Sequence, residues 1–148
     1  MKILELAQRV QRKYGTNNPS EILSALGVKV FYIPMSGVRG IYKRIERNTI
    51  VFADSDLDER DTQFVLGHEL GHHLLHRGEN RVFLDRCTYA KTSVQEHEAD
   101  LFSVCLMAPY PCEVLSEQCT VDTVACLLGV RHDLAEAYIQ EAEPMAGK

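Results

Sequence analysis

The segment His68-Glu69-Leu70-Gly71-His72 combines two histidines and a glutamate at the spacing that a metal-binding helix provides. Residues four apart lie on the same face of a helix, so His68 and His72 can hold one metal ion between them. Glu69 lies at the flank of that face, close enough to take a proton from a metal-bound water. Two ligands and a general base within five residues predict a zinc peptidase.

The residues around this segment predict a helix from about residue 57 to residue 76. The acidic stretch 54–59 offers several side chains that can cap a helix, and its charge suits the positive N-terminal end of one. Apolar residues then recur at helical spacings, at Phe64, Val65, Leu70, Leu74 and Leu75. The motif therefore lies within a helix, as its metal-binding interpretation requires.

A second helical pattern, from residue 92 to about residue 107, offers the third ligand. A catalytic zinc normally has three protein ligands and one open position for water. Glu96 can complete the set, and Asp100, one turn later, is placed to accept a hydrogen bond from the free ring nitrogen of a ligand histidine. Glu98 projects to another side of the helix, about 200° round from Glu96. Glu96 is the preferred ligand, and Glu98 is the alternative.

Small residues on both predicted helices indicate that the two pack closely. Gly71 inside a helix costs about 1 kcal/mol relative to alanine, which indicates that something packs very close to that turn. Ala99 and Ser103 share the face of Glu96 and Asp100, and both are small enough to let two helices approach. We therefore expect the ligands to come from two helices in contact.

Other residues near the motif have more than one interpretation. His76 continues the register of the two ligands but lies about 6 Å further along the helix axis, so a surface or supporting histidine is favoured over a ligand. His73 and His97 lie on other faces and are expected to be solvated. A group that stabilises the developing oxyanion should also exist. Tyr89, His73 and Tyr42 all stay open as candidates.

Two separated motifs resemble the ImmA/IrrE family of bacterial and phage metallopeptidases. The first is the HELGH segment, and the second is Glu96-His97-Glu98-Ala99-Asp100-Leu101-Phe102, whose helix closes with Leu106-Met107-Ala108-Pro109. The family usually has Leu-Leu-Met-Pro at this closing position, so Ala108 is a small departure that shifts the helix end and not the site. The resemblance covers nearly the whole chain.

This resemblance implies a fold, an activity, a cofactor and a partner. The expected fold class is α+β: a small zincin-like domain of the gluzincin type, in which a short antiparallel or mixed sheet packs on helices. Members of the family are zinc-dependent and cytosolic, and the best understood cleave helix-turn-helix repressors encoded nearby. The implied function is therefore Zn²⁺-dependent, site-specific cleavage of such a repressor, which would derepress a phage, a mobile element or a stress regulon.

Length and composition predict a single cytoplasmic domain. The chain has 148 residues, 25% of them charged and 45% hydrophobic, which is ordinary for a globular protein. Residues 1–9 carry charges too early for a signal peptide, and no apolar run is long enough to cross a membrane. We expect N-terminal helices and strands in 1–56, metal-site helices in 57–108 and a helical part in 109–148.

The beginning of the chain predicts helices followed by strands. Residues 3–14 have apolar side chains at helical spacing, and residues 18–27 form a second helix with Asn18 as its cap. The expected strands are 28–33, 40–46 and 49–53. We expect 40–46 to be an exposed sheet edge beside the metal, where an extended substrate can pair with the chain.

The charge balance disfavours nucleic acid as a direct partner. The net charge is −5, and the last predicted helix, about 133–143, is acidic. Both features favour a protein partner with basic patches, such as a DNA-binding repressor. Residues 120–128 and 133–143, joined by a glycine turn, also suggest a helix-turn-helix, but a helical pair that covers the core is preferred.

The five cysteines favour an intracellular protein. Their odd number and the lack of a Cys-x-x-Cys argue against a disulfide framework. Four recur every seven residues, but Pro109 and Pro111 break the chain between the first two, so no single helix carries them all. These four are Cys105, Cys112, Cys119 and Cys126. We expect reduced, mostly buried cysteines.

Other functional classes stay open beside site-specific proteolysis. A zinc-containing binding protein would inactivate a repressor by sequestration without cleavage, and Glu69 would then only hydrogen-bond the metal-bound water. Hydrolysis of nucleic acid is disfavoured, because the chain is acidic and lacks a basic or aromatic stripe. A peptidase of general housekeeping specificity is the remaining alternative.

Overall fold

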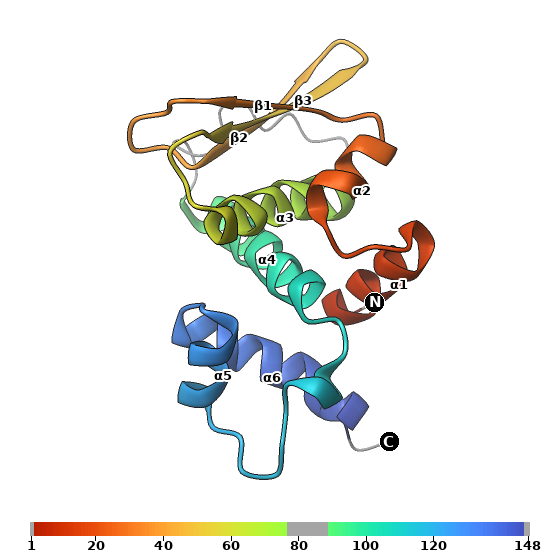
Figure 1. Cartoon of the computed structure of the whole chain (residues 1–148), viewed down its shortest axis with the longest axis vertical. Helices are drawn as coiled ribbons and strands as arrows, with labels where there is room; N and C mark the ends of the chain where they lie inside the picture. The colour runs from red at the N-terminus through yellow and green to blue at the C-terminus, as the bar shows by residue number, and fades with distance from the viewer. Residues whose placement is uncertain (1, 77–88, 147–148) are drawn as a thin grey trace.

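A computed structural model describes residues 2–76 and 89–146 of the chain (Figure 1). Its elements, in chain order, are α1 (Ile3–Tyr14), α2 (Pro19–Ala25), β1 (Lys29–Ile33), β2 (Gly40–Ile45), β3 (Asn48–Asp54), α3 (Glu59–Leu75), α4 (Tyr89–Met107), the 3-10 helix η2 (Pro111–Glu113), α5 (Val121–Leu128) and α6 (His132–Ala146). The sheet lies at one end of the molecule, α3 and α4 cross its middle, and α5 and α6 lie at the other end. The expected α+β class is confirmed.

The three strands form a mixed sheet of order β1-β3-β2. β1 runs parallel to β3, whereas β2 runs antiparallel to it. Val51 of the central strand pairs with Val30 on one side and with Tyr42 on the other. Val51 and Ala53 are fully buried, and α3 covers this face of the sheet (Figure 1). Among the strands that the structure describes, β2 is therefore an edge strand, as expected for residues 40–46.

Side-chain caps fix where the helices around the sheet begin. Asn18 Oδ1 accepts a hydrogen bond from the Ser20 amide at 3.0 Å, and Pro19 occupies the first turn of α2. In the acidic stretch before α3, Asp58 is the residue that caps the helix, because its Oδ1 accepts from the Asp61 amide at 2.7 Å. The metal-motif helix thus starts at Glu59, two residues later than expected.

Helices α3 and α4 approach closely at two glycines. A Cβ on Gly71 would lie 3.1 Å from Ala99 Cα, and one on Gly67 would lie 2.3 Å from Ser103 Oγ. Ser103 Oγ also donates a hydrogen bond to the Phe64 carbonyl at 2.8 Å, which links the two helices. The close packing predicted from Gly71, Ala99 and Ser103 is confirmed, and Gly67 extends it by one turn.

The last two helices cover the core beneath α4. Leu134, Ala135 and Tyr138 of α6 are buried, and the Tyr138 hydroxyl donates to the Ala108 carbonyl at 2.8 Å. α5 ends at Gly129, whose φ of 68° is left-handed, and the chain turns there into α6. The structure thus agrees with a helical pair that covers the core.

The burial expected for the cysteines is only partly right. Cys105 is buried in α4, but Cys112 and Cys126 are exposed and Cys119 is half-buried; all four are free thiols. Cys112 lies in the short η2 and Cys126 on the outer face of α5, and neither surface is covered by another described element.

Within residues 2–76 and 89–146, no helix has an apolar stretch long enough to span a membrane.

Candidate metal centre

Three side chains from two helices converge on one point. Successive turns of α3 present His68 and His72, and α4 presents Glu96 opposite them. Glu96 Oε2 lies 2.9 Å from His68 Nε2, and Glu96 Oε1 lies 2.9 Å from His72 Nε2. The two Nε2 atoms are 3.1 Å apart. The structure therefore brings together the three residues that the sequence selected as metal ligands.

The spacing of these three atoms fits a small divalent cation. Tetrahedral zinc has ligands at about 2.0–2.1 Å, which places neighbouring ligand atoms about 3.3 Å apart. The observed separations of 2.9–3.1 Å lie a few tenths of an ångström below this value. Two imidazole nitrogens and one carboxylate oxygen are also a donor set that suits zinc. The residues present fit the metal.

The electrostatics of the cluster favour added positive charge. Burial by itself would lower the pKa of His68, but hydrogen bonds to Asp100 and Glu96 and the nearby charge of Glu69 raise this pKa to about 10. Burial would likewise raise the pKa of Glu96, but the hydrogen bonds to His68 and His72 lower it well below its usual range. A cation at this point, whether a proton or a metal ion, is therefore stabilised.

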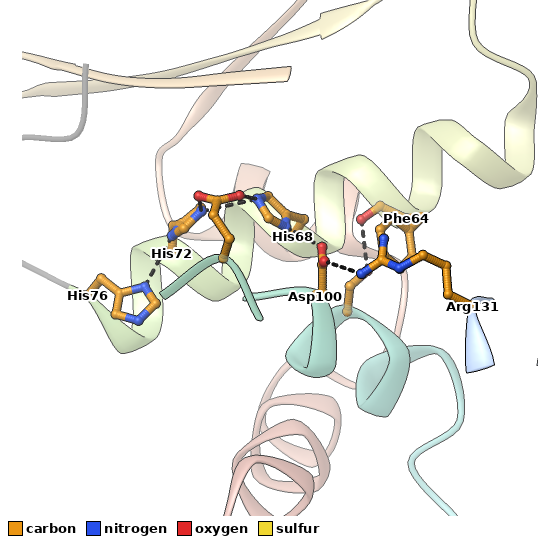
Figure 2. Close-up of polar contacts among 8 residues, drawn as sticks. Phe64, His68, His72, His76, Asp100 and Arg131 are labelled. Atoms are coloured by element: carbon orange, nitrogen blue, oxygen red, sulfur yellow. Dashed lines mark hydrogen bonds and ion pairs between the residues drawn. The ribbon is translucent and has the colours of Figure 1, made fainter. Parts of the chain in front are cut away.

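Asp100 fixes the orientation of one histidine. His68 Nδ1 donates to Asp100 Oδ1 at 2.7 Å, which leaves His68 Nε2 directed at Glu96. The other carboxylate oxygen, Oδ2, accepts from Arg131 Nη2 at 3.1 Å. Figure 2 shows Asp100 between His68 and Arg131. The position predicted for Asp100 agrees with the structure, whereas Arg131 was missed.

His76 and Glu98 lie beside the cluster and not in it. His76 Nδ1 is 3.1 Å from His72 Nδ1, and the His76 side chain is 6% exposed, so this histidine supports a candidate ligand (Figure 2). Glu98 Oε2 lies 3.8 Å from His76 Nε2. The alternative third ligand thus lies beside His76, one turn of α3 beyond His72, and not at the position that Glu96 occupies. His97 is exposed, as expected.

Glu69 lines a cleft of about 370 Å³ that opens beside the cluster. This cleft lies between residues 37–40, the metal-site face of α3 and the Glu96 side of α4. Glu69 is 5% exposed, and a Cβ on Gly40 would lie 3.0 Å from its Oε1. Gly40, at the start of β2, therefore leaves room for Glu69. Sequence reasoning missed this contact, because 29 positions separate the two residues.

Two of the three candidates for an oxyanion donor, Tyr42 and His73, contact each other away from the cleft. Tyr42 on β2 has its hydroxyl 2.8 Å from His73 Nδ1, so the two side chains join the sheet edge to α3. Neither side chain lines the cleft that contains Glu69. His73 is consequently half-buried against the sheet and not solvated as expected. The side chain of Tyr89 lies outside the described residues.

Comparison with known proteins places this arrangement in a family. The model of the IrrE N-terminal-like domain, a metallopeptidase class with a zincin-like fold, matches residues 23–116. The uncharacterized immunity region protein 2 of Bacillus phage phi105 is 34% identical over 133 residues, which cover 86% of this chain and 83% of that protein. Metallopeptidase ImmA of Bacillus subtilis (strain 168) is 27% identical over 96 residues, which cover 65% of this chain and 57% of that protein. The chain belongs to the ImmA/IrrE family.

Proposed function

We propose that this protein is a zinc-dependent endopeptidase. The observation that carries the proposal is the convergence of His68, His72 and Glu96 at one point, with buried Glu69 in the adjoining cleft. These three residues would hold the ion. When bound, zinc supplies a Lewis acid that polarises the scissile carbonyl and makes water a stronger nucleophile at neutral pH.

Glu69 is the general base in this proposal. Its carboxylate accepts a proton from the attacking water and returns the proton to the leaving amine. Glu69 is therefore ionised again at the end of each turnover. Its burial restricts access of bulk solvent and keeps the carboxylate directed into the cleft. Asp100 and His76 hold the rings of His68 and His72 in place during the reaction.

The edge strand β2 gives an extended substrate a place to bind. In the described part of the chain, β2 pairs with β3 alone, which leaves its other edge open. Gly40 at the start of this strand lies against Glu69. A substrate strand that pairs with β2 would therefore pass beside the base, and main-chain hydrogen bonds would hold its scissile peptide there.

The proposed substrate is a helix-turn-helix repressor in the cytoplasm. One relative carries the name of an immunity region protein and another that of a metallopeptidase, which together support proteolysis in the control of a phage or mobile element. The net charge of −5 suits a partner with the basic surface of a DNA-binding protein. Cleavage of that repressor would release the genes that it silences.

A mass-resolved cleavage assay tests this proposal. The zinc-loaded protein and its Glu69→Gln variant are each incubated with the helix-turn-helix regulator encoded beside the gene. We expect one defined pair of fragments from the wild type and none from the variant, with equal zinc contents. A stable complex without fragments would instead support sequestration. Equal cleavage by both proteins would refute the role of Glu69.

A further inference from the structure

Basic side chains line the cleft that contains Glu69, and the proposed hydrolysis leaves them without a role. Arg39, in the loop before β2, and Arg131, before α6, line the cleft together with His68, Glu69 and Glu96. Both arginines are exposed, and the side chain of Arg131 is 61% accessible. Two guanidinium groups are thus accessible from the cleft that holds the base.

A second cavity extends the basic character away from the metal cluster. This cavity, of about 270 Å³, shares Arg39, Phe64 and Arg131 with the first cleft and adds Arg60 from the first turn of α3. Its lining contains three guanidinium groups and one carboxylate, that of Asp61. A chain with a net charge of −5 therefore concentrates positive charge next to its candidate metal centre.

Two carboxylates hold Arg131 in position, and Arg60 lies against Gly129. Arg131 Nη2 donates to Asp100 Oδ2 at 3.1 Å, and its Nε donates to Asp133 Oδ1 at 3.2 Å. A guanidinium has five N–H donors, so three of them stay available to a ligand. A Cβ on Gly129 would lie 2.0 Å from Arg60 Nη2, so this glycine leaves the space that the Arg60 side chain fills.

Arg39 and Arg131 differ in their ion pairs. Within the described residues, neither Arg39 nor Arg60 makes an ion pair, in contrast to Arg131. Three carboxylates also line the first cleft: Glu96 contacts the two histidines, Asp100 contacts His68 and Arg131, and Glu69 is buried. In the part of the chain that the structure describes, no carboxylate pairs with the guanidinium of Arg39, which can therefore bind an incoming anion.

We propose that Arg39 and Arg131 form a subsite for an acidic side chain of the protein substrate. This inference rests on the proposed peptidase function and adds a sequence preference to it. Guanidinium groups bind carboxylates through planar pairs of charge-assisted hydrogen bonds, so aspartate or glutamate fits better than a neutral residue. Because the same cleft also holds Glu69, the acidic residue would lie close to the scissile bond in the substrate sequence.

The terminal carboxylate of a substrate has the same chemistry as an acidic side chain. A site for chain ends would remove a few residues from peptides, whereas a subsite for side chains selects internal positions. No other described strand pairs with the outer edge of β2, so a substrate strand could continue along it past the cleft, which favours internal cleavage. The test therefore records where each cut lies within its peptide.

A peptide library makes the preference measurable without knowledge of the natural substrate. Peptides from a chymotryptic digest of a bacterial proteome are incubated with the zinc-loaded full chain, and new termini are identified by mass spectrometry. We expect aspartate or glutamate to be enriched roughly three- to tenfold at one position near the cut. Glu69→Gln identifies the background, because it should generate no new termini.

Charge reversal tests the assignment to Arg39. In Arg39→Glu, the enrichment of acidic residues should be lost and replaced by lysine or arginine at the same position. Arg44→Glu is the matched control, because Arg44 is an exposed arginine on β2 that lines neither cavity. Its acidic preference should equal that of the wild type. A merely structural role of Arg39 would lower all rates together without reversing the preference.

The possible outcomes separate the subsite from the peptidase function. Wild-type cuts without acidic enrichment, or cuts confined to the last three residues of the peptides, overturn the subsite and leave the peptidase standing. The same holds if Arg39→Glu keeps the wild-type preference. Absence of wild-type cuts above the Glu69→Gln background overturns the peptidase, and the subsite with it.

Discussion

Glu96 and Glu98 stand two positions apart on α4, yet only Glu96 contacts His68 and His72. Glu96→Gln replaces the anionic ligand by a neutral amide, so we expect zinc affinity to fall on the order of 100-fold. Glu98→Gln is the matched control and should change the affinity by less than about threefold. Competition with a chromophoric chelator measures both. Loss of zinc from the control alone would make Glu98 the ligand.

Residues of the site differ in how far the sequence could predict them. His68, Glu69 and His72 lie within one turn and a half of a helix, so local periodicity determines how they face each other. Glu96 and Asp100 were placed by the same rule on a second helix. Arg131 was not, because nothing in the α5–α6 turn shows that it folds back onto α4. Contacts of this kind depend on tertiary packing, for which a single sequence carries no periodic signal.

The same limit applies to Gly40 at the start of β2. In the sequence it is only the first residue of a predicted strand, but in the fold it is the surface that Glu69 packs against. A Cβ at this position would lie 2.7 Å from Val65 Cγ1 and 3.0 Å from Glu69 Oε1. The space beside the proposed general base is therefore created by a residue whose role becomes visible only after the sheet has formed.

Gly40→Ala should consequently impair the reaction without removing the metal. The added methyl group pushes against Val65 and Glu69, and a misplacement of the base by about 1 Å costs on the order of 100-fold in rate. We expect kcat/KM to fall between about 10- and 100-fold while zinc content stays unchanged. Elemental analysis and a cleavage assay with the same sample test this. Parallel loss of zinc would show that the strand is needed to hold the metal helix.

At the scale of elements, the contact between α3 and α4 determines the metal geometry. The proposed ligands come from both helices, so their spacing depends on how closely the helices approach at Gly67 and Gly71. The helix pattern and the small residues predicted this contact correctly. The strand order β1-β3-β2 and the parallel pairing of β1 with β3 were not predictable in the same way. Strands pair between residues that are far apart in the sequence, and no short-range spacing indicates which strands will be neighbours.

A double-mutant cycle at Gly67 and Ser103 measures this packing. Alanine is the better helix former by about 1 kcal/mol, but a Cβ 2.3 Å from Ser103 Oγ forces a displacement that costs about 1–3 kcal/mol. Gly67→Ala should therefore lower the free energy of unfolding. In a Ser103→Ala background the same change should cost less, because the Oγ atom is absent. Urea unfolding of the zinc-loaded proteins gives all four values. Strict additivity would argue against the close contact.

For the whole molecule, zinc should act as a link between folding and function. The buried Glu69 and the pair of Glu96 and Asp100 concentrate negative charge around two histidines, and a cation compensates this charge only when α3 and α4 are folded together. An unfolded chain offers no such arrangement of donors. Zinc bound at this site would therefore prefer the native state, and its binding free energy would add to the stability of the fold.

Removal of zinc should lower the melting temperature of the protein. At free zinc 100 times above the dissociation constant, the ligand adds about 2.7 kcal/mol, which corresponds to about 5–11 °C for a chain of this size. Calorimetry with and without a chelator measures the difference. Glu69→Gln should keep this difference, because Glu69 is assigned to the reaction and not to the metal, whereas Glu96→Gln should lose most of it. If Glu69→Gln also abolished the shift, the separation between base and ligands would be wrong, and loss of cleavage in that variant could no longer be attributed to proton transfer.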